Sequence, residues 1–246
     1  MRFAAIADIH GNLLALEAVL ADIARLGIKD VVNLGDHVSG PLEAARTADL
    51  LMQCGFATIR GDQDRRLLQA WDGGKGASKR RDFQQLEPRH FDWLAAQPTT
   101  MVYRDEIFLC HGSPRDDACY WLDHVAPDGS IQARPIQQVE TEAEGVDASL
   151  ILCAHTHLPR AVRLSDGRMA VNPGSVGLPG YDGQKPVYHV VQTGTPDACY
   201  AILEKGGHAW SVTFRHVPYD PQPMAALAAR AGLPLWANAI NTGWFR

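Results

Sequence analysis

The sequence lacks several features that mark particular classes of protein. It has only five cysteines, an odd number with no CxxC pair, which indicates neither a disulfide framework nor a thiolate metal site. It has no basic excess, since its formal net charge is −5, and this argues against nucleic acid or a membrane surface as partner. No apolar run approaches the roughly 18 residues of a membrane span, and no charged leader precedes the first apolar segment. We therefore expect an unprocessed cytoplasmic protein with small-molecule partners.

The chain has instead the composition of one large core, with 246 residues of which 46% are hydrophobic, and no repeat or linker-like segment. We expect a single domain over residues 1–246. The first part alternates between elements: strands are predicted over 2–7, 30–34 and 56–60, and helices over 13–26, 42–53 and 63–71. Such alternation is typical of an α/β sheet with parallel strands.

The later part of the chain has a different pattern. A tight hairpin is predicted from 100–103 and 106–110, after a helix that begins at Pro88. Residues 113–136 are expected to form a loop with a short helix, followed by a polar helix over about 137–146 and a strand over 150–154. Antiparallel strands and one closing helix follow. The pattern indicates two sheets packed face to face, with helices outside.

Side chains that can hold a metal follow five of the predicted strands. They are Asp8, His10, Asp36, Asp62, His111, His155 and His157. Because the carboxyl ends of parallel strands open onto one crevice, we expect these side chains to converge. Carboxylates mixed with imidazoles suit Mn, Fe, Co, Ni or Zn. Seven donors exceed the needs of one ion, whereas two ions about 3.5–4 Å apart that share a carboxylate would use them all.

Two of these motifs are pairs of donors separated by one residue. Asp8 pairs with His10, and His155 pairs with His157. If the backbone is extended there, both side chains of a pair lie on the same side and reach one cation.

In their order and spacing these motifs resemble those of the calcineurin-like metallophosphoesterases. The residues that carry the resemblance are Asp8-Ile9-His10, Gly35-Asp36, Gly61-Asp62-Gln63-Asp64, His111-Gly112 and Ala154-His155-Thr156-His157, over residues 2 to about 175. Asn172-Pro173-Gly174-Ser175, and Gly40-Pro41 close behind Gly35-Asp36, are similar to the small bacterial phosphodiesterase branch.

The resemblance implies a fold, a division of the donors and a nucleophile. The implied fold is a four-layer α/β/β/α sandwich of two mixed sheets with flanking helices. Asp8, His10 and His157 would hold a first metal; Asp62, His111 and His155 would hold a second; and Asp36 would bridge them. The implied nucleophile is a metal-bridging hydroxide.

The third motif departs from the family pattern, which has Asn as ligand and then His. Asp62 still offers oxygen, but three carboxylates against two divalent ions leave a charge of +1 where the Asn site has +2. One unit charge at about 4 Å and an effective dielectric near 20 is worth roughly 4 kcal/mol, and the penalty doubles for a dianionic monoester. Gln63 can donate a hydrogen bond to phosphate but cannot supply the proton transfer that is worth about 10²–10⁴-fold. Gln63 and Asp64 are the candidate catalytic residues, and Asp64 is also interpretable as a partner behind the ligands or as a first-turn acid.

Several residues have two readings. Asp62 is a ligand or only the N-cap of its helix. His37 follows the predicted bridge and either faces the site or is packed elsewhere. The glycine-rich basic stretch 72–85 is a solvated loop or a phosphate-attracting lid formed by Lys75, Lys79, Arg80 and Arg81. The segment 172–177 is an ordinary turn or one whose amides approach the metals.

We predict a dinuclear metal-dependent phosphoesterase, and more specifically a phosphodiesterase acting on small or nucleotide-like phosphate esters. Two alternatives stay open. One is a phosphomonoesterase acting on proteins or small molecules. The other is a catalytically impaired scaffold or regulatory protein of the same fold, which the loss of the motif histidine favours and the retention of every other ligand type opposes.

Overall fold

The computed structural model describes residues 1–71, 84–207 and 209–246. Residues 72–83, which include the basic side chains of the proposed lid, lie outside the described residues.

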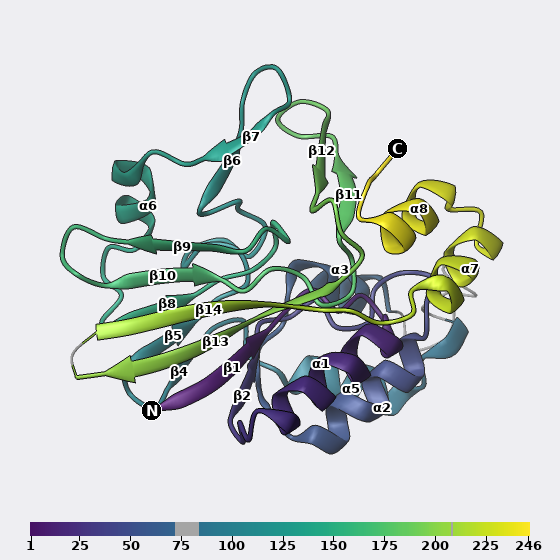
Figure 1. Cartoon of the computed structure of the whole chain (residues 1–246), viewed down its shortest axis with the longest axis horizontal. Helices are drawn as coiled ribbons and strands as arrows, with labels where there is room; N and C mark the ends of the chain where they lie inside the picture. The colour runs from purple at the N-terminus through teal and green to yellow at the C-terminus, as the bar shows by residue number, and fades with distance from the viewer. Residues whose placement is uncertain (72–83, 208) are drawn as a thin grey trace.

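One five-stranded sheet has the order β14-β13-β1-β2-β3 (Figure 1). Its parallel strands are β1 (Arg2–Ile6), β2 (Val31–Asn33) and β3 (Ala57–Thr58). Helices α1 (Leu13–Arg25), α2 (Ala44–Cys54) and α3 (Asp62–Ala70) follow them in turn. The antiparallel strands β13 (Ala198–Gly206) and β14 (Ala209–Val217) extend the sheet beyond β1. The predicted alternation of parallel strands and helices is confirmed.

The second five-stranded sheet has the order β4-β5-β8-β10-β9. Its strands are β4 (Met101–Tyr103), β5 (Ile107–Leu109), β8 (Leu150–Leu152), β9 (Arg160–Arg163) and β10 (Met169–Asn172). β5, β8 and β10 are parallel, whereas β4 and β9 are antiparallel edges. Arg104 and Asp105, both at positive φ, form the tight turn between β4 and β5, as predicted.

The two sheets pack face to face around the main core. Apolar side chains of both sheets and of the loops that follow their strands, among them Phe3, Leu34 and Leu152, form one buried cluster between the sheets. A second cluster packs α1 on the outer face of the first sheet. A third joins α6 (Ile136–Glu142) to the outer face of the second sheet. The predicted four-layer α/β/β/α arrangement is confirmed.

The expectation of a short helix within 113–136 is wrong. Two strands stand there instead, β6 (Asp123–Val125) and β7 (Ile131–Ala133), paired antiparallel. Their connection contains Pro127-Asp128-Gly129, with Gly129 at φ 83°, and Ala126 N donates to Ser130 O at 2.8 Å. A proline, an acid and a glycine between apolar residues favour a turn over a helix.

The C-terminal part also contains more elements than predicted. β11 (Gly180–Gly183) and β12 (His189–Gln192) form a separate two-stranded sheet. The predicted closing helix is α7 (Gln222–Arg230), but a further helix, α8 (Pro234–Thr242), packs beside it (Figure 1). The helix expected at Pro88 is α5 (Pro88–Ala96). Of the helices in the described ranges, none has both the length and the apolar character that crossing a membrane requires.

An ionic cluster around the buried carboxylate of Asp22 connects α1 to β13 and β14. Tyr200 donates its hydroxyl to Asp22 Oδ2 at 2.8 Å, and Arg215 Nη2 lies 2.9 Å from Asp22 Oδ1. Arg25 also contacts Asp22. Burial raises the pKa of Asp22, but the hydrogen bonds from Tyr200, Arg25 and Arg215 outweigh it, so the pKa lies below its usual value.

Candidate metal centre

The seven candidate donors come from loops that directly follow β1, β2, β5 and β8 and from the start of α3. Five of them have a left-handed backbone: Asp8, His10, Asp36, His155 and His157 have φ between 50° and 70°. Neither donor pair is therefore extended, which corrects the local geometry on which their convergence was predicted. Left-handed conformations of non-glycine residues cost about 1–3 kcal/mol each and are concentrated at functional sites.

The first group of donors surrounds the end of β1. One ligand atom from each of Asp8, His10 and His157 lies within 4.8 Å of the other two. Asp8 Oδ1 is 3.5 Å from His157 Nε2, and the Nε2 atoms of the two imidazoles are 3.3 Å apart. These are separations that donors around one ion can have.

The second group consists of Asp62, His111 and His155, which meet the same distance criterion. His111 Nε2 is 3.5 Å from Asp62 Oδ1, and His155 Nδ1 is 3.2 Å from that oxygen. Asp36 lies between the groups, because its Oδ2 is 3.4 Å from His111 Nε2 and 3.7 Å from His10 Nε2. The structure thus brings together both of the triplets that the family resemblance implied, with Asp36 next to each.

Hydrogen bonds on the far side of the rings orient two of the imidazoles. His111 Nδ1 is 2.7 Å from Leu34 O, and His157 Nδ1 is 2.6 Å from Leu178 O. A carbonyl oxygen only accepts, so both Nδ1 atoms carry the hydrogen. In the neutral ring each Nε2 is then a lone-pair donor directed into the site, which is how metal-binding histidines are usually held.

The electrostatics of the site favour bound cations. Burial and the nearby charges of Asp36 and Asp62 raise the pKa of Asp8 well above its usual value. Burial, together with His10, lowers the pKa of His157 well below its usual value and keeps the ring neutral. Positive charge placed among these side chains would relieve the repulsion between the carboxylates.

Buried polar atoms without a hydrogen-bond partner indicate whether these residues suit a metal site. Asp8 Oδ1 and His111 Nε2 are buried, and neither makes a hydrogen bond to any residue in 1–71, 84–207 or 209–246. Buried polar atoms of proteins are almost always paired. Both atoms face the centre of the donor set, where a cation would pair them, so the residues present fit the metal ions that the motifs imply.

Asp62 does not cap its helix. The N-cap of α3 is Gly61, and Asp62 is the first helical residue, with its carboxylate turned toward His111 and His155. Burial raises the pKa of Asp62, but His111 and His155 lower it by more, and the carboxyl is ionised. The reading of Asp62 as a cap alone is therefore wrong.

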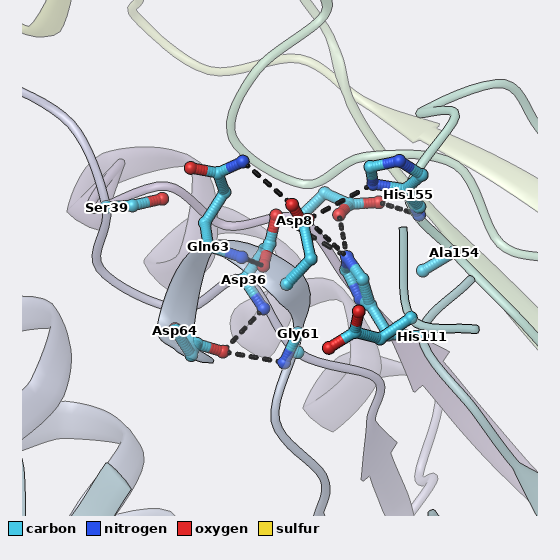
Figure 2. A network of polar contacts seen from close by, with 12 residues as sticks. Asp8, Asp36, Ser39, Gly61, Gln63, Asp64, His111, Ala154 and His155 are labelled. Carbon is cyan, nitrogen blue, oxygen red and sulfur yellow. Dashed lines mark hydrogen bonds and ion pairs between the residues drawn. The ribbon is translucent and has the colours of Figure 1, made fainter. Parts of the chain in front are cut away.

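Asp64 lies behind the ligands, not in the cavity. Its Oδ2 accepts hydrogen bonds from the backbone N–H of Asp36 at 2.8 Å and of Gly61 at 2.9 Å (Figure 2). Its Oδ1 accepts from His37 N at 3.0 Å. The His37 ring is also fully buried, with Nδ1 2.6 Å from Asp64 Oδ2, and packs on Trp93. Asp64 and His37 are thus placed to hold the loop that carries Asp36.

Gln63 has the opposite orientation. Its backbone N–H donates to Asp36 Oδ1 at 2.9 Å, its Nε2 donates to Asp62 Oδ2 at 3.0 Å, and its side chain lines the cavity over the donors. Of the two candidate catalytic residues, Gln63 alone lies where a substrate can reach it.

The turn at 172–177 supports the first ligand loop. Ser175 Oγ donates to Asp8 O at 2.8 Å, and Gly177 N donates to the same oxygen at 3.0 Å. A Cβ on Gly177 would lie 1.8 Å from Ile9 O, so only glycine allows this approach. The amide of Gly177 therefore bonds to the backbone of the ligand loop.

A cavity of about 480 Å³ opens above the donors and is of the size that binds small molecules. Five donors line it, namely His10, Asp36, Asp62, His155 and His157. Ser39, Tyr181 and Trp236 also line it and were not predicted. Ser39 lies three residues after Asp36, the predicted bridge, and its Oγ is 3.0 Å from His10 Nδ1. Its closeness to Asp36 in the sequence was a signal by which it could have been predicted as a site residue. Tyr181 and Trp236 come from distant segments with no recognisable motif.

Comparisons with known proteins agree with this geometry. A family profile described as a calcineurin-like phosphoesterase superfamily domain matches residues 1–195. A metallophosphoesterase from Sphaerobacter thermophilus has a TM-score of 0.73 at 26% identity, with 98% of each chain covered. The uncharacterized protein MJ0912 of Methanocaldococcus jannaschii is 22% identical over 255 residues, covering 95% of this chain and 94% of that protein. A putative diadenosine tetraphosphatase, at 15% identity, 87% and 93% coverage and a TM-score of 0.51, shares the fold. The chain belongs to the calcineurin-like phosphoesterase superfamily.

Proposed function

We propose that this protein is a dinuclear metal-dependent phosphodiesterase that hydrolyses small or nucleotide-like phosphate esters. Membership of the superfamily supports phosphoester hydrolysis. The observation that carries the dinuclear proposal is the pair of donor triplets with Asp36 beside both. Bound there, two ions of Mn, Fe, Co, Ni or Zn would act as Lewis acids on the phosphoryl group and activate the attacking water.

The charge of the site favours diesters over monoesters. Asp36, Asp62 and Asp182 line the cavity, and no Lys or Arg of the described residues does so. With two divalent ions bound, the three donor carboxylates would leave the centre a charge of only about +1, and Arg66 Nη2, 3.1 Å from Asp62 Oδ2, pairs with one of them. Once that charge is neutralised, a second negative charge on the substrate would be repelled by the carboxylates that line the cavity. A monoanionic diester avoids that repulsion, whereas a dianionic monoester does not.

Gln63 has a defined part in this proposal. Its amide is held over the site by Asp62 and can bind a non-bridging phosphate oxygen. It has no titratable proton, so the leaving group must depart without general-acid help from this residue. We therefore infer that diesters with acidic leaving groups are hydrolysed best.

A paired assay tests the proposal. The protein is stripped with chelator, reloaded with each of the five metals, and assayed on bis-(p-nitrophenyl) phosphate and p-nitrophenyl phosphate, with metal content measured by mass spectrometry. We expect close to two ions per chain and a higher kcat/KM for the diester. His157→Ala should lower metal content, and His216→Ala, at an exposed histidine on β14, is the matched control.

Each alternative has its own signature in the same assay. A higher kcat/KM for the monoester would support a phosphomonoesterase. Protein that binds two ions but turns over neither ester, or binds none, would refute the enzyme and favour the scaffold reading.

A further inference from the structure

The cavity over the metal centre has a wall that the superfamily profile does not reach. The profile ends at residue 195, whereas Ala231, Leu233 and Trp236 line the same cavity as the proposed ligands. Leu233 precedes α8 and is 40% exposed, and Trp236 lies in the first turn of α8. The C-terminal helices thus place apolar side chains beside the site at which phosphate is proposed to bind.

Two contacts fix the Trp236 ring at this position. The ring meets the imidazole of His10 edge to face, with centroids 6.1 Å apart and planes at 87°. It also packs on the backbone of Gly40, where an added Cβ would lie only 2.8 Å from Trp236 Cζ3. A ring already held in place loses little conformational freedom when a ligand binds against it.

The side chains around Trp236 define the chemistry of its ligand. Leu178, Leu233 and Pro41 line the cavity with it. In the part of the chain that the structure describes, this lining offers no Lys or Arg to pair with a second phosphate. These side chains suit an uncharged, apolar group on this side of the cavity, and an indole favours a flat ring over an aliphatic group because aromatic rings stack.

We propose that Trp236 is a specificity-determining residue that binds a planar aromatic ester group of the substrate. This inference rests on the proposed function and extends it from phosphodiesters in general to those with an aryl or nucleobase-like group. Stacking of a base on an aromatic side chain is typically worth about tenfold or more in affinity.

Binding of three phosphonates to the Mn-loaded protein tests the subsite without turnover. Calorimetry should give a Kd for phenylphosphonate about tenfold below those for methylphosphonate and cyclohexylphosphonate. Trp236→Leu keeps an apolar side chain at the position but should abolish the preference, whereas Trp236→Phe should retain part of it. Trp244→Ala, at another tryptophan of the C-terminal segment that is 39% exposed and outside the cavity lining, should leave the preference intact. Equal Kd values for phenyl and cyclohexyl, or a preference that survives Trp236→Leu, would overturn the proposal.

Two diesters with the same leaving group separate this proposal from the function itself. Phenyl p-nitrophenyl phosphate should have a KM about tenfold below that of methyl p-nitrophenyl phosphate at similar kcat, and Trp236→Leu should remove the difference. Turnover of both at equal KM would refute the aromatic subsite and leave the phosphodiesterase standing. Turnover of neither, with the phosphonate preference intact, would refute the hydrolytic function and leave the subsite.

Discussion

Replacing Asp64 with asparagine should reveal whether this carboxylate supports the site or acts in it. The two residues have the same shape, so the change alters charge and hydrogen bonding alone. Asp64 is fully buried and accepts from the backbone N–H groups of Asp36, His37 and Gly61. The orientation that costs least keeps the amide oxygen at Oδ2, and the new NH₂ group then faces the N–H of His37.

The expected cost follows from these contacts. A hydrogen bond to a charged group contributes about 1.5–3 kcal/mol to stability. In the variant the bond from His37 N is lost, and the bonds from the N–H groups of Asp36 and Gly61 are made to a neutral acceptor instead of a charged one. We expect the free energy of unfolding to fall by about 3 kcal/mol in Asp64→Asn. Urea unfolding followed by circular dichroism, with chelator present, measures this without any contribution from bound metal. Asp92→Asn, an exposed acid on α5, is the matched control and should change stability by less than about 0.5 kcal/mol.

The opposite pattern would refute the reasoning. If Asp64→Asn unfolds at the same urea concentration as the wild type and retains two metal ions, its hydrogen bonds are not needed to hold the loop. A large loss of kcat in such a protein would show that the carboxylate takes part directly in the reaction, despite its position behind Asp36.

Asp36→Asn should cost about tenfold more activity than Asp62→Asn, about 1.4 kcal/mol of transition-state stabilisation, because Asp36 is proposed to serve both ions; equal losses at saturating metal would exclude the bridge. The double change Asp62→Asn with Gln63→His should raise turnover of esters with poor leaving groups more than of those with good ones, flattening the dependence of rate on leaving-group pKa. A wild-type dependence that is already flat would show that another group supplies the proton. The lowered pKa of Asp22 means that its contribution to stability is complete above pH about 4 and is lost as pH falls through the folded-state value. The free energy of unfolding of Asp22→Asn should therefore be about 2 kcal/mol below that of the wild type at pH 7, and this difference should become smaller below pH 4. A difference in free energy of unfolding that does not change with pH would contradict this.

The layers could be predicted from the sequence because they depend on local patterns, and so could the convergence of the donor side chains at the strand ends, whereas their division into two triplets was implied only by the family resemblance. Short apolar runs marked the parallel strands, and each proposed ligand stood directly after such a run or, for Asp62, at the following helix start. The backbone of those loops was not predictable from residue type. Asp8 and His10 have a left-handed conformation, which remains uncommon in aspartate and histidine even though both adopt it more often than most residues.

The parts that sequence reasoning missed depend on contacts between distant segments. Trp236 reaches the cavity because its ring packs on Gly40 and His10, about 200 residues earlier in the chain, and no local pattern encodes that contact. The β6–β7 hairpin was a different kind of error, because Pro127-Asp128-Gly129 carried a usable turn signal. The same holds for α8, which begins with Pro234 and ends at Gly243 in a left-handed C-cap.

The left-handed backbone at five of the seven donors sets stability and activity against each other at the same positions. Substitution by glycine would relieve the backbone strain at Asp8, His10, Asp36, His155 or His157, but each such substitution would also remove a metal donor. An engineering screen for thermostability alone would therefore enrich inactive variants at these sites. A search for stabilising changes that preserve function should exclude these five positions and the glycines that support them, and work instead on the outer helices.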